Sequence, residues 1–314
     1  MDALSAILND LRLEDAAHRQ LALHGDWALE VAMPERALVY VVISGELHYH
    51  TDSGLRGRVS AGELILLPSG SRHRLSRRAT PASSLTPLVP GDSRGESRDL
   101  VLGEGALHSR ILCAWFRIEA RAAPTLTAML PELVHVQAQP HPPVWLLTGI
   151  HFIREELGGD QPGNAVILNR LMDIMLVQCV RYCLEQGQIQ GLGWLAGLRD
   201  PALGRALALM HAEPQRPWKL TELAHRAGLS RSAFAARFRD RVGSPPMEYL
   251  YGLRMELAAR ILKLSPQLRM AEVAARAGYG SEQAFSRAFR DYHGVSPGRF
   301  RAAAVTEKPT EKPL

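Results

Sequence analysis

The sequence predicts an α+β protein of two domains: an N-terminal β-barrel followed by helices, and a C-terminal all-α domain. Two observations predict this division. Runs that alternate apolar and polar residues, separated by glycine and proline, dominate the first 125 residues and are typical of strands. Between residues 220 and 301 one helical pattern instead occurs twice, about 50 residues apart, which indicates an internal repeat.

Each copy of the repeat reads as a helix, a glycine turn and a second helix. Gly228 and Gly278 follow alanine-rich helical runs, at positions where a helix ends in the left-handed conformation. Ser230 and Ser281 stand just before the next helix, where a hydroxyl accepts a free backbone N–H. This layout is a helix-turn-helix, whose second helix enters the DNA major groove. A helical repeat used for protein contacts is the alternative.

Paired aromatic residues predict which side of each second helix faces inward. Both pairs are spaced i, i+4 and therefore share one helix face; they are Phe234 with Phe238 and Phe285 with Phe289. Between the copies, Pro246 suits the first turn of a helix and Ser265-Pro266 stops it. Some 18 helical residues give a spacer of roughly 27 Å, so one subunit can address two successive turns of the major groove.

The charge distribution also favours DNA as a partner. Residues 200 to 301 hold 17 Lys+Arg against 9 Asp+Glu, whereas the rest of the chain holds 20 against 23. The basic excess behind the pI of about 9.3 therefore belongs to the repeat region. A basic region of this kind is the electrostatic footprint of a phosphate-binding surface.

Residues 200 to 301 resemble the DNA-binding domain of the AraC/XylS family of bacterial transcription regulators. The residues that carry the resemblance are Ala277-Gly278-Tyr279, Phe285, Phe289, Gly294, Ser296-Pro297 and Phe300-Arg301. The resemblance implies binding to promoter DNA and contact with RNA polymerase, usually as an activator.

Helix geometry and the family's contact positions together predict which side chains contact DNA. In the second copy these are Glu282, Gln283, Ser286 and Arg287, and in the first they are Arg231, Ser232, Ala235, Ala236 and Arg237. Arginine bonds guanine in bidentate fashion and glutamine bonds adenine. The first copy lacks the family's usual reading arginine. Its alanines are expected to contact thymine methyls, and its arginines to hold phosphate.

The N-terminal part has strand patterns. Residues 37 to 43 are an apolar strand run, Gly45 lies in a turn, and residues 47 to 50 alternate, which predicts a hairpin. The segment from Gly62 to His73 has the spacing G-x5-P-x-G-x2-H, which resembles the second motif of cupins, small β-barrels. This resemblance implies that His73 points into the barrel.

Histidine spacing bears on metal binding. The resemblance to cupin enzymes implies that two histidines and a glutamate upstream of Gly45 bind a metal, but no His-x-His is present there. We therefore expect no metal, no other cofactor and no enzyme activity. His48 and His50 share one strand face, however, and a different metal site with His73 is an alternative. The corresponding alternative function is a cupin dioxygenase or isomerase fused to a DNA-binding domain. A third class, DNA repair through a zinc-activated cysteine, needs four cysteines, and the chain has 3.

The middle of the chain is expected to hold an insertion, a strand and helices. A strand over residues 109 to 118 is buried on both faces and includes Cys113, and the helix over residues 164 to 185 carries a broad apolar stripe. That stripe is either intradomain core or a homodimer interface, and its charged interruptions exclude a membrane span. The predicted boundaries are 1–125 for the barrel with a flexible insertion at 77–108, 126–195 for a helical linker and dimerisation region, 196–301 for the double helix-turn-helix domain, and 302–314 for a disordered tail.

These expectations combine into an effector-responsive transcription regulator. The effector is a small molecule or an oxidant of unknown identity, for which His73, Cys113, His48 and His50 are the candidate sensor residues. Few cysteines and no signal peptide predict a cytoplasmic protein, in which the thiols are either small buried hydrophobes or a redox switch.

Overall fold

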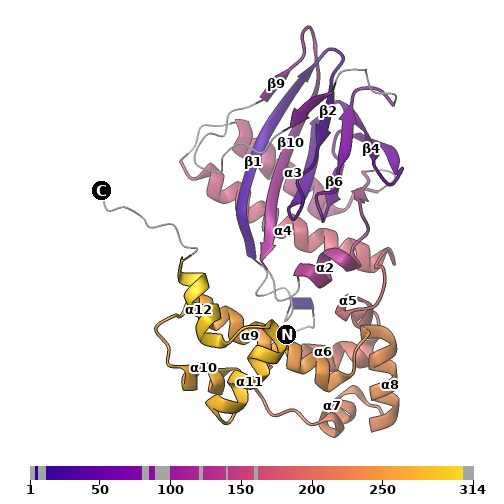
Figure 1. Ribbon diagram of the computed structural model, residues 1–314. Helices are drawn as coiled ribbons and strands as arrows, with labels where there is room; N and C mark the ends of the chain where they lie inside the picture. Colours follow the sequence, from indigo (N-terminus) through magenta and orange to yellow (C-terminus); the bar gives the residue numbers. More distant parts are fainter. Residues whose placement is uncertain are drawn as a thin grey trace. The chain divides into compact units, whose positions relative to one another are not determined.

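The computed structural model describes residues 4–5, 12–79, 85–88, 100–119, 123–138, 141–158 and 162–306. The chain divides into two compact units, with Leu11–Gln190 in one and Gly191–Leu314, together with the first ten residues, in the other. Figure 1 shows that the first is built on strands and the second on helices. This two-domain α+β layout confirms the predicted fold class.

Eleven strands form two sheets in the described part of the first unit. The larger sheet has the order β11-β6-β3-β10-β1-β9, and the smaller has the order β5-β4-β7-β2-β8. The strands are β1 (Arg12–His24), β2 (Ala28–Val31), β3 (Ala37–Ser44), β4 (Glu46–Thr51), β5 (Arg56–Ser60), β6 (Leu64–Leu67), β7 (His73–Ser76), β8 (Thr86–Leu88), β9 (Leu100–Leu102), β10 (Leu107–Glu119) and β11 (Val134–Val136).

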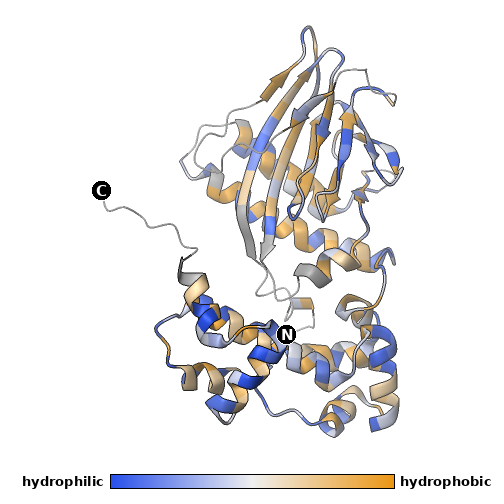
Figure 2. Ribbon diagram, in the orientation of Figure 1, coloured by the Kyte–Doolittle hydropathy of each residue, from blue (hydrophilic) through white to orange (hydrophobic). Residues whose placement is uncertain are grey.

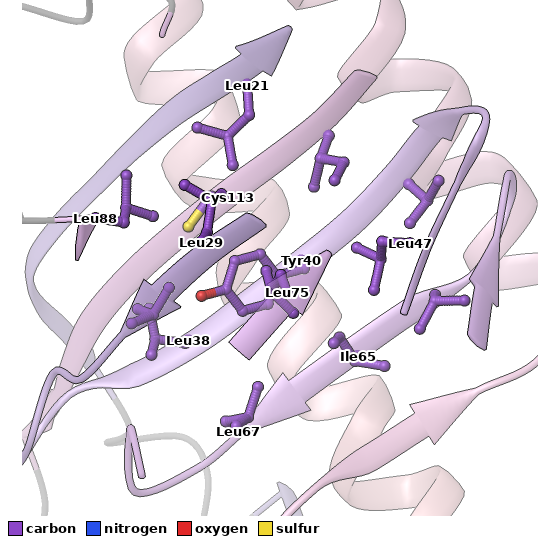
Figure 3. Close-up of a cluster of buried hydrophobic side chains, with 14 of the residues drawn as sticks. Leu21, Leu29, Leu38, Tyr40, Leu47, Ile65, Leu67, Leu75, Leu88 and Cys113 are labelled. Carbon is purple, nitrogen blue, oxygen red and sulfur yellow. The ribbon is translucent and has the colours of Figure 1, made fainter. Parts of the chain in front are cut away.

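One apolar core lies between the two sheets. Leu21, Leu38 and Ile65 enter it from the larger sheet, and Leu29 and Leu75 from the smaller one. Figure 3 shows these side chains together with Tyr40 and Cys113. Alternate residues of each strand face this core, as the period of two requires. No pairing among the described strands joins one sheet to the other, so the two sheets do not close into a barrel.

The predicted hairpin over residues 37 to 50 is wrong, although both of its strands exist. β3 pairs with β10 and β6 in the larger sheet, whereas β4 pairs with β5 and β7 in the smaller one. The chain changes sheets at Gly45, which has φ +77° and where an added Cβ would lie 2.0 Å from the carbonyl oxygen of His108. The Ser109 hydroxyl then accepts from the Glu46 amide at 3.3 Å and donates to the Glu46 carbonyl at 2.6 Å.

The stretch predicted as a flexible insertion, 77–108, contains two short strands. β8 pairs in parallel with β2, and β9 pairs in parallel with β1. Each makes only three residue pairs at a sheet edge, where backbone hydrogen bonds suffice and no apolar alternation is needed. The sequence pattern therefore had no signal for them. Residues 80–84 and 89–99 of this stretch lie outside the described residues.

The described residues of the first unit also form three helices: α2 (Ala123–Met129), α3 (Val144–Gly158) and α4 (Asn164–Glu185). α4 contacts β1 and β11, and α3 contacts β3 and α4. Most of the predicted apolar stripe of α4 is buried, including Met172, Cys179 and Cys183, whereas Ile174 on the same helix is 55% exposed. No helix among the described residues combines the length and the apolar character that crossing a membrane requires.

The second unit is all helical in its described residues. Its helices are α5 (Trp194–Leu198), α6 (Pro201–Ala212), α7 (Leu220–Ala227), α8 (Arg231–Val242), α9 (Pro246–Leu264), α10 (Met270–Arg276), α11 (Glu282–His293) and α12 (Pro297–Thr306). Figure 2 shows apolar and polar residues alternating around these helices, as amphipathic packing requires. α12 continues beyond the predicted start of the tail at residue 302, and residues 307–314 lie outside the described part.

Only glycine fits at position 278 without strain, so its replacement is expected to destabilise the protein. The φ of Gly278 is +82°, and a Cβ would lie 2.5 Å from the backbone oxygen of Gln215. We expect Gly278→Ala to lower the free energy of unfolding by about 1–3 kcal/mol, measured by urea unfolding. The control is Gly280→Ala, where a Cβ meets nothing within 4 Å and φ is not positive. An equal loss in both variants would contradict the assignment.

Candidate nucleic-acid interface and sensor core

The second helix-turn-helix consists of α10 and α11. The Ser281 hydroxyl accepts from the Ala284 amide at 3.2 Å, so α11 begins where the sequence predicts. Phe285 and Phe289 are fully buried against α9 and α12. The Tyr251 hydroxyl of α9 donates to the Ala288 carbonyl at 2.7 Å and fixes the rotation of α11.

The predicted reading residues lie on the opposite side of α11. Glu282, Gln283 and Arg287 are exposed and Ser286 is half-buried. A hollow of about 380 Å³ opens beside Gln283 and Arg287 and is also lined by Tyr251. Three of the four residues are therefore exposed on this side of α11, and all four carry hydrogen-bonding groups of the kind that read base edges.

The first helix-turn-helix consists of α7 and α8 and repeats this construction. The Ser230 hydroxyl accepts from the Ala233 amide at 3.2 Å, and Phe234 and Phe238 are fully buried. On the outer side of α8 the predicted contact residues Arg231, Ser232, Ala236 and Arg237 are exposed, and Ala235 is half-buried. This side of α8 is less polar than the corresponding side of α11.

Arg237 has a structural partner that the sequence analysis missed. Its Nε donates to a carboxylate oxygen of Asp200. Asp200 is also the N-cap of α6, because its other carboxylate oxygen accepts from the Ala202 amide at 3.0 Å. Arg237 therefore ties α8 to α6. Asp200 could have been noticed from the sequence, since Asp-Pro is a common helix start.

Several other basic side chains of this unit bind backbone carbonyls at helix ends or in the turns that follow them. Arg205 donates to the carbonyl of Ala227 at 2.9 Å, at the end of α7. Arg254 donates to the carbonyl of Pro214 at 2.8 Å, and Arg301 to that of Pro266 at 3.0 Å. These guanidinium groups satisfy carbonyls that lack a helical partner. Part of the basic excess is therefore structural.

In the first unit, His73, Tyr40 and Cys113 meet in the core between the sheets. The Nδ1–H of His73 donates to the Ser71 carbonyl at 2.7 Å, which leaves Nε2 to accept from the Tyr40 hydroxyl at 2.9 Å. Cys113 is the direct cross-strand partner of Tyr40 and is fully buried beside it. The prediction that His73 points inward is confirmed, since it is 1% exposed.

Burial governs the ionisation of this cluster. Desolvation lowers the pKa of His73, so the ring stays neutral. Desolvation also raises the pKa of the Cys113 thiol and of the Cys183 thiol to about 12, and raises that of Cys179. Thiols protonated in this way are poor nucleophiles, which disfavours a redox role.

His48 and His50 lie on the other face of the smaller sheet. His73 pairs with Thr51, whereas His48 pairs with Ser76 and His50 with Arg74. Because neighbouring residues of a strand point to opposite faces, His73 cannot share a site with the other two histidines. The alternative metal site is therefore wrong. Among the described residues, no group of three or more His, Cys, Asp or Glu side chains has the arrangement of a metal site.

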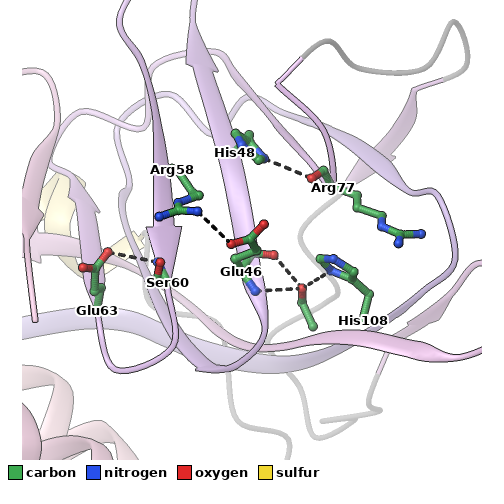
Figure 4. A network of polar contacts seen from close by, with 8 residues as sticks. Glu46, His48, Arg58, Ser60, Glu63, Arg77 and His108 are labelled. Carbon is green, nitrogen blue, oxygen red and sulfur yellow. Dashed lines mark hydrogen bonds and ion pairs between the residues drawn. The ribbon is translucent and has the colours of Figure 1, made fainter.

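Polar contacts on this outer face hold the sheet edges (Figure 4). His48 Nδ1 lies 3.0 Å from the Arg77 carbonyl, and Arg58 pairs with Glu46 at 3.4 Å. Glu63 is nearly buried, where it accepts from the Ser60 amide and pairs with His135 of β11 at 2.9 Å. The contact with Arg77 accounts for the half-buried His48 of β4 without a ligand.

Comparisons with known proteins agree with the two-unit architecture. Residues 2–185 match the family described as "Cupin", and residues 223–303 match the family described as "Helix-turn-helix domain". The HTH-type transcriptional regulator AlkR of Acinetobacter baylyi is 32% identical over 96% of this chain and 99% of its own. A putative AraC-like transcription regulator of Streptomyces lividans is 34% identical over 96% and 98%. The HTH-type transcriptional regulator MtrA of Neisseria gonorrhoeae is 29% identical over the same shares.

The buried neutral His73 predicts acid sensitivity. The unfolded chain takes up a proton on this ring near pH 6.5, whereas the folded protein, with its lowered pKa, resists it. The free energy of unfolding is therefore expected to fall as the pH drops below about 6.5, by up to about 1.4 kcal/mol per pH unit from this group. His73→Gln should show a shallower slope between pH 7 and pH 5 in urea unfolding. Val59→Ala, which alters a buried side chain of the same core that does not titrate, should keep the slope of the wild type. Identical slopes in all three proteins would count against the buried neutral ring.

Proposed function

This chain belongs to the AraC family of helix-turn-helix transcription regulators, in the group with a cupin N-terminal domain, and from that premise we propose that its two reading helices contact promoter DNA unequally. The protein is a DNA-binding regulator of transcription. Its relatives carry names of regulators, so the enzyme alternative is set aside.

The observation that carries the proposal is the difference between two otherwise matching helices. α8 and α11 each begin at a serine cap and each bury two phenylalanines. Outward, α11 offers Glu282, Gln283, Ser286 and Arg287, whereas α8 offers Arg231, Ser232, Ala235, Ala236 and Arg237. Bidentate arginine and glutamine contacts discriminate bases strongly, whereas alanine contacts only thymine methyls. Base specificity therefore rests mainly on α11.

The role of α8 is chiefly to hold the DNA backbone. Arg231 is exposed at the first turn of the helix, where backbone N–H groups also point outward. Arg237 keeps its side chain 51% exposed while it binds Asp200. Its remaining N–H groups are available to a phosphate, and the ion pair with Asp200 sets their direction.

The N-terminal unit is proposed to receive the signal, in the cytoplasm. Of the two effector classes expected from the sequence, burial of all three cysteines favours a small molecule over an oxidant. His73 and Cys113 lie in the packed core between the sheets, whereas His48 and His50 lie on the outer face of the smaller sheet. The output is proposed to be activation through RNA polymerase.

A homodimer is proposed through the outer face of α3 and α4. Large apolar side chains are exposed on these two helices: Leu147, Phe152, Val166, Ile167 and Ile174. Exposed apolar side chains gathered on neighbouring helices are typical of an interface. The buried part of the α4 stripe packs into the unit's own core. The sequence left open whether the stripe is core or a dimer interface, and in this proposal α4 serves both, each on a different side of the helix.

Substitutions in the two reading helices are expected to have different effects. Arg287→Ala should weaken binding to the cognate operator by about 1–3 kcal/mol and relax the preference at one base pair. Arg231→Ala should weaken binding to all sequences about equally. Fluorescence anisotropy with the operator and its single-base variants measures both. Unchanged operator binding by Arg287→Ala, or a base-specific effect of Arg231→Ala, would contradict the proposed roles.

Ile174→Glu is expected to shift the protein from dimer to monomer, because it places a charge in the proposed interface. Sedimentation equilibrium of the full chain measures the change. The matched control is Val101→Glu, which alters a side chain of similar exposure on β9. If both variants keep the mass of a dimer, the interface lies elsewhere, and a monomeric wild type would reject the dimer.

A further inference from the structure

A cleft opens in the N-terminal unit between the start of α3 and the end of α4. Its volume is about 530 Å³, which lies within the range of small-molecule sites. Its walls come from the first residues of α3, the segment before it, and the last two turns of α4. It is separate from the core that holds His73 and Cys113, whose side chains are at most 1% exposed.

The walls combine two aromatic side chains with polar groups. Trp145 and Tyr182 are half-buried and line the cleft from α3 and α4. Partial burial raises the pKa of Tyr182, so its hydroxyl stays neutral and can donate a hydrogen bond. The Gln178 amide on the same wall both donates and accepts. Aromatic surfaces beside several hydrogen-bonding groups suit a ligand with both a planar body and polar ends.

Two opposite charges stand at this cleft one helical turn apart. Arg181 and Glu185 both line it and both are exposed. Neither forms an ion pair among the described residues. An arginine that precedes glutamate at i, i+4 is in the less favourable order for pairing within a helix. Each charge therefore remains available to a ligand.

We propose that this cleft binds a small zwitterion with a flat apolar body, of the class of a free aromatic amino acid. The ligand's carboxylate pairs with Arg181, its ammonium group pairs with Glu185, and its body lies against Trp145 and Tyr182. Both charges of the cleft are then neutralised by one molecule, which a simple carboxylate or a simple amine cannot do. The inference rests on the proposed function, because it names the class of signal that the regulator receives.

The position of the cleft explains how occupancy acts on the rest of the chain. α4 ends at Glu185, and the DNA-binding unit begins at Gly191. A ligand that bridges α3 and the last turns of α4 restrains the segment that leads into that unit. It also restrains the helix pair that carries the proposed dimer face.

The test is calorimetric titration of the full chain with L-phenylalanine and L-tryptophan. We expect saturable binding with a dissociation constant below about 10 mM. Two probes that lack one charge, 3-phenylpropionate and 2-phenylethylamine, should bind about tenfold more weakly. Absence of saturable binding by both amino acids, or equal binding of all four probes, would overturn the proposal.

Charge-removing variants test the assignment of each contact. Arg181→Gln should weaken phenylalanine and 3-phenylpropionate about tenfold and leave 2-phenylethylamine unchanged, and Glu185→Gln should show the reverse pattern. Arg170→Gln is the control, since Arg170 is an exposed arginine of the same helix that does not line the cleft. Equal effects of all three variants would overturn the site.

Operator binding is measured without ligand in parallel. If the protein binds the operator but none of the four probes, only the inference about the cleft is rejected. If it binds the probes as expected but not the operator, only the proposed function is rejected.

Discussion

The burial of two phenylalanines one turn apart fixes the rotation of each reading helix, and the DNA-binding unit depends on this constraint. In α8 the rings of Phe234 and Phe238 are 5.6 Å apart at 58°, and Phe285 and Phe289 of α11 have the same separation and angle. Each fully buried ring contributes several kcal/mol to stability, so the helix cannot rotate without a large loss. The opposite side must therefore face the solvent. Because both copies share this geometry, the difference in function that we propose for them rests on the outward residues alone.

Polar contacts determine where the helices begin and end, in addition to the rotation that apolar packing imposes. Serine caps fix where the two reading helices begin, and guanidinium groups bind the carbonyls that helix ends leave free. The ion pair of Arg237 with Asp200 links an exposed side chain of α8 to the cap of a neighbouring helix. Part of the unit's positive charge therefore has a structural role. In the N-terminal unit the corresponding buried contact is the hydrogen bond between His73 and Tyr40, which joins the two sheets across the apolar core.

Local features of the fold were predictable from the sequence, whereas pairings between distant strands were not. The glycine turns, the serine caps and the phenylalanine pairs depend on residues within one or two helical turns, and the structure confirms them. The path of β4 into the other sheet depends on Ser109, which is 63 residues away from Glu46. The separation of His73 from His48 and His50 depends on strand register, which a single sequence does not reveal. The cleft between α3 and α4 is formed by segments apart in sequence, so its residues carried no recognisable motif.

Unequal reading by the two helices is the central claim, and selection of bound sequences from a random DNA pool tests it most directly. The account predicts an enriched motif with one strongly specified block, read by α11, and a weakly specified block about 10 base pairs away, read by α8. In the Arg287→Ala variant the strong block should lose information at one position, while the weak block is unchanged. Two equally specified blocks, or loss of information in the weak block instead, would contradict the account.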